Sequence, residues 1–143
     1  MGDKEPYYLA VDPGLHTGWA VWNRQGECLD FGTTHSDDEL HQKLSLFETI
    51  GKVIIEDYTL WYHKARKQAG SKMPAPKAIG IVETFARNWK AEIIKQGSDI
   101  KPIAEKWTER STKGVPKAKT HVLDALNHGD YYLIKNNIKQ IRL

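Results

Sequence analysis

Two short apolar segments each end in a carboxylate, and these acids are the first residues whose placement indicates chemistry. The stretch YYLAVDPG ends its apolar run in Asp12, directly before a Pro-Gly turn. The stretch KVIIEDY ends its β-branched run in Glu56. An ordinary strand exit needs only turn residues. If the two strands lie side by side, both carboxylates reach the same rim of a buried sheet.

The last apolar-periodic segment of the chain adds a third acidic group. His121, Asp124 and His128 are spaced i, i+3 and i+7, which places them on one face of a helix. A helix laid across the sheet then aims His121 and Asp124 at Asp12 and Glu56. The side chains expected to pack on the sheet from other parts of this helix are Val122, Leu126 and Leu133.

A cluster of three carboxylates predicts a divalent metal site. Like charges held close together raise each other's pKa values and destabilise the fold unless a cation compensates them. Oxygen ligands suit Mg²⁺ or Mn²⁺. Two such ions about 4 Å apart activate a water and stabilise the leaving oxygen in phosphodiester hydrolysis. A neutral imidazole from His121 can ligate one ion or transfer a proton.

Each of these residues also has an ordinary role that the sequence leaves open. Asp-Pro-Gly is a common turn, and Glu56 can be a surface acid after a strand. Asp124 can pair with Lys119 or Lys135 on an exposed helix, and His128 is typical of a surface or capping histidine. The metal-site prediction therefore depends on the combination of motifs.

Length, composition and the N-terminal residues limit the class of protein. The 143 residues suit one domain spanning 1–143, with a net charge of +3 and a single cysteine, Cys28. No apolar run approaches the roughly 18 residues of a membrane span. The start MGDKEP is acidic and polar, unlike a secretory signal. One unpaired cysteine fits a reducing compartment, so we expect a cytoplasmic protein that does not interact with membranes.

Charge is unevenly distributed along the chain. Residues 27–48 carry six acids and one base, whereas 61–77 carry five bases and no acid, and 101–119 carry six bases and two acids. This asymmetry predicts a polyanionic partner on one side of the molecule. The alternative is that these bases lie in solvated, lysine-rich loops.

The order of apolar periods predicts a mixed α/β sheet with helices packed on its faces. Strands are expected at 7–12, 18–22, 27–32 and 52–58, and a helix with Ser36 as its N-cap is expected to bury Leu40, Leu44 and Phe47. Residues 59–77 are interpreted mostly as a loop. An amphipathic helix is expected over 78–96 and ending at Gly97, with its apolar stripe formed by Val82, Phe85, Ala86, Trp89 and Ile93. That stripe either packs on the sheet or contributes to a dimer interface.

The remaining segments complete the predicted sheet and its last helix. Residues 99–104 are interpreted as an edge strand because Pro102 lacks an amide hydrogen. A second basic loop follows at 109–119. The final helix is expected at 119–136.

Three motifs resemble RuvC-type Holliday junction resolvases of the RNase H-like superfamily. LAVDPGLHTGWAVW is similar to the opening motif of that family, and VIIEDY occupies the place of its second catalytic acid. KAIGIVETFARNW resembles the helix that follows in the family, and HVLDALNHGDYYL resembles its closing motif. In that motif an acid or histidine precedes the last aspartate by three residues, a place that His121 fills.

The resemblance implies an RNase H-like fold with a mixed five-stranded sheet, a homodimer, and two active sites that nick opposed strands of a four-way junction. It implies Mg²⁺ or Mn²⁺ as cofactor, with Asp12, Glu56, His121 and Asp124 as ligands. Asp12 is then expected to bridge two ions, Glu56 and Asp124 to hold one each, and His121 to complete a shell or assist proton transfer. Attack by water leaves a 5′-phosphate and a 3′-hydroxyl.

The basic segments and nearby aromatic residues are predicted to bind DNA. Bases are expected to contact phosphates, and aromatic rings to stack on unpaired bases at a branch point. These residues are Tyr58, Trp61, Tyr62, Lys64, Arg66, Lys67, Lys72, Lys113, Lys117 and Lys119. The aromatic residues can instead pack in the core. They give no obvious match to the phenylalanine that the family uses near the junction centre. The short chain resembles compact, phage-type members of the family, and this resemblance implies other branched DNA as a further substrate.

Three other functions share some of these features. An RNA-processing nuclease of the YqgF type would share the metal site, although Asp-Pro-Gly and the His121–Asp124 pair favour the resolvase. A non-catalytic protein that binds branched DNA would be expected to have lost an acid, and none is missing. An actin-like phosphate-binding module needs two lobes, for which the chain is too short.

Overall fold

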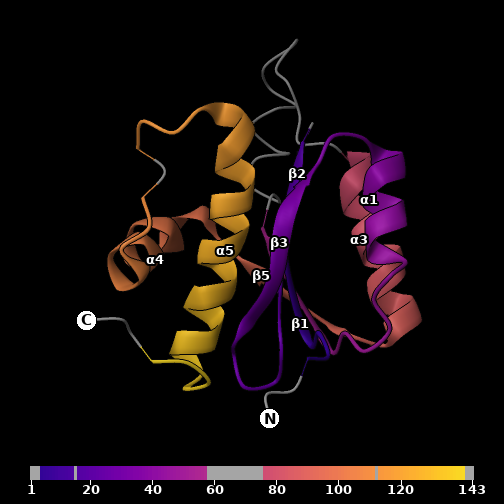
Figure 1. The fold of residues 1–143 in the computed structure, drawn as a ribbon, viewed down its shortest axis with the longest axis horizontal. Helices are drawn as coiled ribbons and strands as arrows, with labels where there is room; N and C mark the ends of the chain where they lie inside the picture. Colours follow the sequence, from indigo (N-terminus) through magenta and orange to yellow (C-terminus); the bar gives the residue numbers. More distant parts are fainter. Residues whose placement is uncertain (1–3, 15, 58–75, 112, 141–143) are drawn as a thin grey trace.

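Five strands form one mixed sheet in the order β3-β2-β1-β4-β5 (Figure 1). The computed structural model describes residues 4–14, 16–57, 76–111 and 113–140. The first three strands are antiparallel neighbours, whereas β4 runs parallel to both β1 and β5. The strands are β1 (Tyr8–Asp12), β2 (Thr17–Trp22), β3 (Cys28–Thr34), β4 (Lys52–Glu56) and β5 (Glu92–Gln96). The predicted mixed five-stranded α/β sheet is confirmed.

Helices cover both faces of this sheet. In Figure 1, α1 and α3 lie together on one side, while α5 crosses the other side and α4 packs against α5. The elements are α1 (Asp37–Leu44), α3 (Pro76–Trp89), the short 3₁₀ helix η1 (Ser98–Ile100), α4 (Lys101–Thr108) and α5 (Lys117–Lys135). In the described ranges, no helix has the length and apolarity needed to cross a bilayer.

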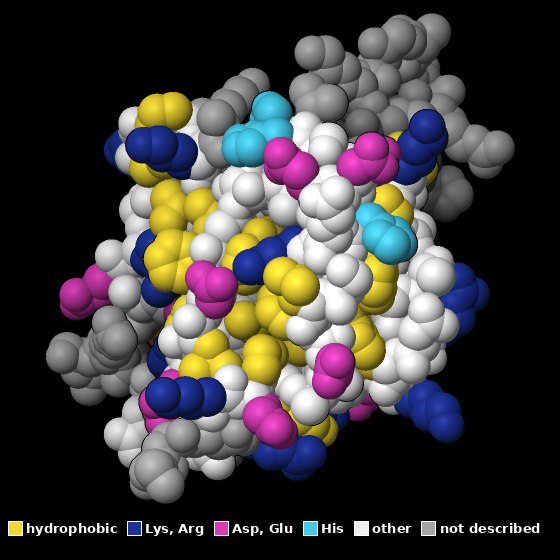
Figure 2. Space-filling view, turned by 45° about the vertical axis from the view of Figure 1, so that its right-hand side comes forward, with side chains coloured by type: hydrophobic (Ala, Val, Ile, Leu, Met, Phe, Trp, Pro, Cys, Tyr) yellow, Lys and Arg dark blue, Asp and Glu magenta, His cyan; other side chains and the backbone are white. Residues whose placement is uncertain are grey.

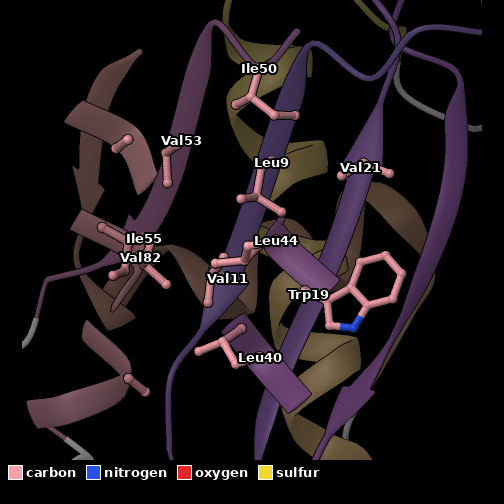
Figure 3. Packing of buried hydrophobic residues seen from close by; sticks show 12 residues of the cluster. Leu9, Val11, Trp19, Val21, Leu40, Leu44, Ile50, Val53, Ile55 and Val82 are labelled. Atoms are coloured by element: carbon pink, nitrogen blue, oxygen red, sulfur yellow. The ribbon is translucent and has the colours of Figure 1, made fainter. Parts of the chain in front are cut away.

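Two hydrophobic cores form because successive strand residues point to opposite faces of the sheet. Odd-numbered residues such as Leu9 and Val11 pack under α1 and α3, together with the fully buried Leu40 and Leu44 (Figure 3). The alternate set packs under α5. Its buried members are Tyr8, Ala10, Ala20, Trp22, Ile54, Leu126 and Leu133. Strands β1, β2 and β4 are buried on both faces and are therefore mostly apolar, whereas the edge strands β3 and β5 are partly exposed.

Helix α1 begins as its sequence predicts. The Ser36 hydroxyl oxygen accepts a hydrogen bond from the Glu39 amide at 3.1 Å, which caps the first turn. Leu40 and Leu44 are buried, as expected from their spacing. Phe47 lies beyond the end of the helix and packs against the same core only in part.

The expected helix over 78–96 is wrong after Trp89. Helix α3 ends at Trp89, where Lys90 takes a left-handed φ of 58°. The Lys90 amide donates to the Arg87 carbonyl, and the Ala91 amide donates to the Ala86 carbonyl at 2.9 Å. This pair of hydrogen bonds is a Schellman ending, which usually carries glycine or asparagine at the left-handed position. A lysine at this position does not signal the end of a helix, so the sequence alone indicates that the helix ends at Gly97.

The residues after this ending form the strand β5, which the sequence does not predict. Ile93 and Ile94 pair in parallel with Val53 and Ile54 of β4. The apolar stripe of α3 packs on the sheet, since Val82 and Ala86 are buried in the first core.

The expected edge strand over 99–104 is also wrong. These residues form η1 and the start of α4, with Pro102 in the first turn of that helix. Proline is well tolerated there because the amides of the first turn have no partner within the helix. The segment that the sequence assigned to the sheet edge is therefore helical and follows β5 in the chain, and Lys101 at the start of α4 contacts the site described below.

Candidate functional site

Asp12 and Glu56 lie next to each other at one edge of the sheet. Strands β1 and β4 are parallel neighbours in which Val11 pairs with Ile55, so the next residue of each strand is the acid. The carboxyl ends of parallel strands meet at the same edge. Both acids are buried, with only 3% of Asp12 and 7% of Glu56 exposed. The local sequence explains this position: an apolar strand buried on both faces carries the acid to the rim.

Helix α5 crosses the sheet so closely that one strand residue must be glycine. A Cβ atom on Gly18 of β2 would overlap the backbone carbon and oxygen of His121. Gly18 is the Cα partner of Asp12 in the β1–β2 register. The Thr-Gly after the Asp-Pro-Gly turn therefore lets the helix backbone reach the sheet beside Asp12.

This close approach brings His121 to Asp12. The His121 Nδ1 atom lies 3.0 Å from Asp12 Oδ2, where a protonated Nδ1 donates to the carboxylate. That hydrogen bond, more than any other contact, raises the pKa of His121 above its usual 6.5, although burial acts in the opposite direction. The pair links two segments that are separated by most of the chain.

Asp124 and Glu56 are joined through Lys101 at the start of α4. The Lys101 Nζ atom lies 3.0 Å from Glu56 Oε1 and 3.3 Å from Asp124 Oδ2. Burial lowers the pKa of Lys101, but the two carboxylates outweigh it and the net pKa is raised above 10.5. The ammonium group therefore neutralises part of the acidic cluster.

The carboxylates of the acidic cluster repel one another, and Lys101 offsets this repulsion only in part. Burial, followed by the nearby charge of Asp12, raises the pKa of Asp124 above 3.8 despite the opposing effect of Lys101. The charges of Asp12 and Glu56 thus both act on Asp124, as expected of a crowded set of carboxylates.

The donor set fits a divalent cation in its chemistry. Three carboxylates and an imidazole are oxygen and nitrogen ligands of the kind that Mg²⁺ and Mn²⁺ accept. The Lys101 ammonium already occupies a cation position between Glu56 and Asp124. With the side chains as they stand, no three His, Cys, Asp or Glu groups among the described residues converge closely enough to hold one ion. A metal would therefore have to draw these side chains together.

His128 occupies a position that its sequence did not predict. The expected surface or capping histidine is fully buried, with 0% exposed. Its Nε2 atom lies 3.5 Å from Glu56 Oε1. The i, i+3, i+7 spacing was the available signal, since it places His128 on the same helix face as His121 and Asp124.

Asp124 does not form the ion pair with Lys119 or Lys135 that its sequence left open. Asp124 contacts Lys101, which is far from it in sequence, and not Lys119 or Lys135. Lys101 is a site residue that sequence reasoning missed. No local signal marks it, because its segment has the pattern of an edge strand. Gln96, which contacts His128, was missed because it falls at the end of the helix expected over 78–96.

The predicted DNA-binding residues are only partly described by the structure. Lys113 and Lys119 are exposed, the side chain of Lys117 is not described, and the remaining members lie outside the described residues. Those members are Tyr58, Trp61, Tyr62, Lys64, Arg66, Lys67 and Lys72. On the face turned forward in Figure 2, the described acids and bases are interspersed with apolar groups.

Comparison with known proteins finds similar structures but no matching family model or curated sequence. No protein-family model matches the chain, and no curated protein sequence matches it. Among solved structures, RuvC from Thermus thermophilus in complex with a Holliday junction substrate matches with a TM-score of 0.57 and 13% identity. A second Thermus thermophilus RuvC structure matches with a TM-score of 0.58 and 13% identity. Both cover 94% of this chain and 99% of the matched chain. The chain therefore has a RuvC-type, RNase H-like α/β fold.

Proposed function

We propose that this protein is a metal-dependent, structure-specific endodeoxyribonuclease that nicks four-way DNA junctions and other branched DNA by phosphodiester hydrolysis. The observation that carries the proposal is the meeting of Asp12, Glu56 and Asp124 with His121 at one edge of the sheet. The RuvC-type fold supports it, because one of the matched structures is a RuvC bound to a Holliday junction.

The proposed roles follow from the contacts of each side chain. Asp12, Glu56, Asp124 and His121 would hold the divalent cations, and Lys101 would yield its place between Glu56 and Asp124. A bound pair of Mg²⁺ or Mn²⁺ ions supplies activation of a water and stabilisation of the leaving oxygen. His121 is oriented by Asp12, so its imidazole is held ready to ligate or to move a proton at Nε2.

The proposed partner is branched DNA, and the proposed assembly is a homodimer in the cytoplasm. A four-way junction has two strands to be cut, and a dimer would supply one site for each. Exposed Lys113 and Lys119 would contact phosphates near the beginning of α5, one turn before His121 and Asp124. Tyr58, Trp61 and Tyr62 keep their proposed role in stacking on bases at the branch point.

The decisive experiment compares cleavage of several labelled substrates. The protein is incubated with a four-way junction, a flap, a plain duplex and an RNA–DNA hybrid, with Mg²⁺ or Mn²⁺ or with a chelator. Paired symmetric nicks in the junction that require the metal are expected, and cutting of flaps is expected to be weaker. Preference for the hybrid would favour an RNA-processing nuclease. Binding of the junction without metal-dependent cleavage of any substrate would overturn the catalytic proposal.

Two matched variants make this test specific to the site. Asp12→Asn removes one carboxylate of the cluster and is expected to abolish cleavage while junction binding persists. Asp57→Asn removes an exposed acid directly after Glu56 and is expected to cleave normally. Equal loss of cleavage in both variants would contradict the assignment of the site to Asp12.

A further inference from the structure

His128 is a fully buried histidine that the proposed set of metal ligands does not include. It lies one helical turn beyond Asp124 on α5, with 0% of its surface exposed. Among the described residues its Nε2 atom has no hydrogen-bond partner. One carboxylate lies close to it: the Oε1 atom of Glu56 is 3.5 Å from Nε2. A buried polar nitrogen without a hydrogen bond is costly, so this arrangement needs a physical reason.

Gln96 at the end of β5 determines which ring nitrogen of this imidazole accepts a hydrogen bond. The Gln96 Nε2 atom donates to the backbone carbonyl of His128 at 2.9 Å. A carbonyl oxygen only accepts, so the atom facing it must be the amide nitrogen and not the amide oxygen. The same Nε2 atom lies 3.1 Å from His128 Nδ1. Because an amide nitrogen only donates, Nδ1 must be the acceptor and carries no hydrogen.

The remaining ring nitrogen therefore carries the hydrogen and faces the acid. With Nδ1 accepting, His128 is the neutral tautomer with its hydrogen on Nε2. That hydrogen lies on the atom 3.5 Å from Glu56 Oε1. A shift of about half an ångström in Glu56 would bring the two atoms to ordinary hydrogen-bond distance. Glu56 Oε1 is also the oxygen that Lys101 contacts, from a different element.

We propose that Gln96 and His128 form a positioning pair that holds Glu56 in the orientation needed to bind a divalent cation. The pair supplies a neutral donor, which orients the carboxylate without cancelling the negative charge that attracts the metal. It acts in the manner of residues that hydrogen-bond to metal ligands, whose loss commonly lowers metal affinity about 10–100-fold. This inference rests on the proposed function, since it takes Glu56 to be a metal ligand.

The competing explanation is that His128 only fills space beneath α5. Three substitutions separate the two explanations. His128→Gln keeps an amide donor near the place of Nε2, His128→Asn keeps an acceptor near the place of Nδ1 but does not reach Glu56, and His128→Leu keeps neither. Gln96→Leu leaves the imidazole in place and removes the group that selects its tautomer. Thermal unfolding of the metal-free variants identifies any that fail to fold.

The first measurement reads the tautomer directly in the metal-free protein. Correlation of ring carbon-bound hydrogens with ring ¹⁵N nuclei distinguishes the two neutral forms of histidine from the charged form. The Nε2–H tautomer is expected for His128 at neutral pH, and Gln96→Leu is expected to shift it toward Nδ1–H. A charged ring or an Nδ1–H tautomer in the unaltered chain would overturn the inference. This measurement does not depend on nuclease activity.

The second measurement is the affinity of each folded variant for Mn²⁺ by titration calorimetry. His128→Gln is expected to bind within about threefold of the unaltered chain, whereas His128→Asn and His128→Leu are expected to lose about 10–100-fold. Equal affinity in all variants would overturn the positioning role and leave the proposed function intact. Absence of Mn²⁺ binding by the unaltered chain would overturn the proposed function itself, and this inference with it.

Discussion

At the scale of single residues, the site is a set of acids held by cations from elements distant in sequence. Asp12 is bound by His121, and Glu56 shares Lys101 with Asp124. Burial and then the charge of Asp12 raise the pKa of Asp124, and Lys101 offsets these effects only in part. The site in the metal-free protein is therefore under electrostatic strain that a divalent cation would relieve.

Lys101→Met is expected to destabilise the metal-free protein and to increase its stabilisation by Mn²⁺. Because its net pKa is raised, the ammonium form of Lys101 stabilises the fold at all pH values below about 10.5. Its removal leaves two buried acids without their shared cation and should cost about 1–3 kcal/mol. Mn²⁺ should then raise the melting temperature further in the variant than in the unaltered chain, because the metal no longer displaces an ammonium group.

Lys52→Met is the matched control for that prediction. Lys52 pairs with Glu92, whose side chain is 63% exposed, at 2.7 Å on a different part of the sheet. Exposed ion pairs contribute between about 0 and 1 kcal/mol. The rise in melting temperature on adding Mn²⁺ should be the same for Lys52→Met as for the unaltered chain. A smaller rise in Lys101→Met would contradict competition between Lys101 and Mn²⁺ for the two carboxylates.

The His121–Asp12 contact predicts a stability that depends on pH. Since the pKa of folded His121 is raised, the contribution of the pair is complete below about pH 6.5, the usual pKa, and is lost as pH rises through the raised value. His121→Gln should therefore lower the free energy of unfolding by about 1 kcal/mol near pH 6 and by less near pH 9. Denaturant titrations at both pH values measure this. The pH dependence should vanish when His121→Gln is made in an Asp12→Asn background, and its persistence there would assign it to other groups.

At the scale of elements, the site depends on how closely α5 approaches the sheet. Gly18 lies against the backbone of His121, and a Cβ on Gly129 would overlap the Trp22 ring. Both glycines allow the helix to lie directly on β2. The positions of His121 and Asp124 relative to Asp12 are therefore determined by backbone contact and not only by side-chain choice.

Gly18→Ala is expected to disable the site through this contact. The added methyl would overlap the helix backbone, and moving α5 away should cost about 1–3 kcal/mol. Cleavage of a four-way junction should fall further than stability alone explains, because His121 and Asp124 move with the helix. Gly80→Ala is the control: Gly80 lies in α3, where an added Cβ would meet no atom of another described segment within 4 Å. This change should therefore stabilise the protein by up to about 1 kcal/mol. Full activity in Gly18→Ala would contradict the role given to close packing.

The same elements show how far the sequence could predict the fold and the site. Asp12 and Glu56 were found because a strand buried on both faces makes a terminal acid conspicuous, and Asp124 because helical spacing is regular. Strand β5 was missed because a lysine, Lys90, occupies the left-handed position that ends α3. Lys101 was missed because a proline beside it is compatible both with an edge strand and with the first turn of a helix. In both cases contacts between segments distant in sequence determine the local structure, and the local sequence does not indicate these contacts.

At the scale of the whole molecule, α5 carries an exposed lysine near each of its ends. Exposed Lys119 lies at its beginning, near His121, and Lys135 lies at its end. The two lysines are separated by 16 positions of helix, or about 24 Å. DNA that reaches the acidic site should therefore contact Lys119, together with Lys113 in the preceding loop, and should not contact Lys135.

The double substitution of Lys113 and Lys119 by glutamine is expected to weaken junction binding in a salt-dependent way. Loss of two phosphate contacts should reduce the slope of log K against log salt concentration by about 2. Fluorescence anisotropy in the absence of divalent metal measures this without cleavage. Lys135→Gln should leave the slope unchanged. An equal effect of Lys135→Gln would indicate general attraction to DNA and no defined path across α5.

The order of the site's residues along the chain has a consequence for protein synthesis. Asp12 and Glu56 lie on strands β1 and β4, which are synthesised before α5, the helix that carries His121 and Asp124. Until α5 docks, one face of the sheet also lacks its cover over Trp22 and the rest of the second core. A nascent chain therefore holds only part of its acids on an incomplete scaffold. A chain whose synthesis stops before α5 lacks two of the four proposed metal ligands, so it is expected neither to complete the fold nor to perform the proposed cleavage.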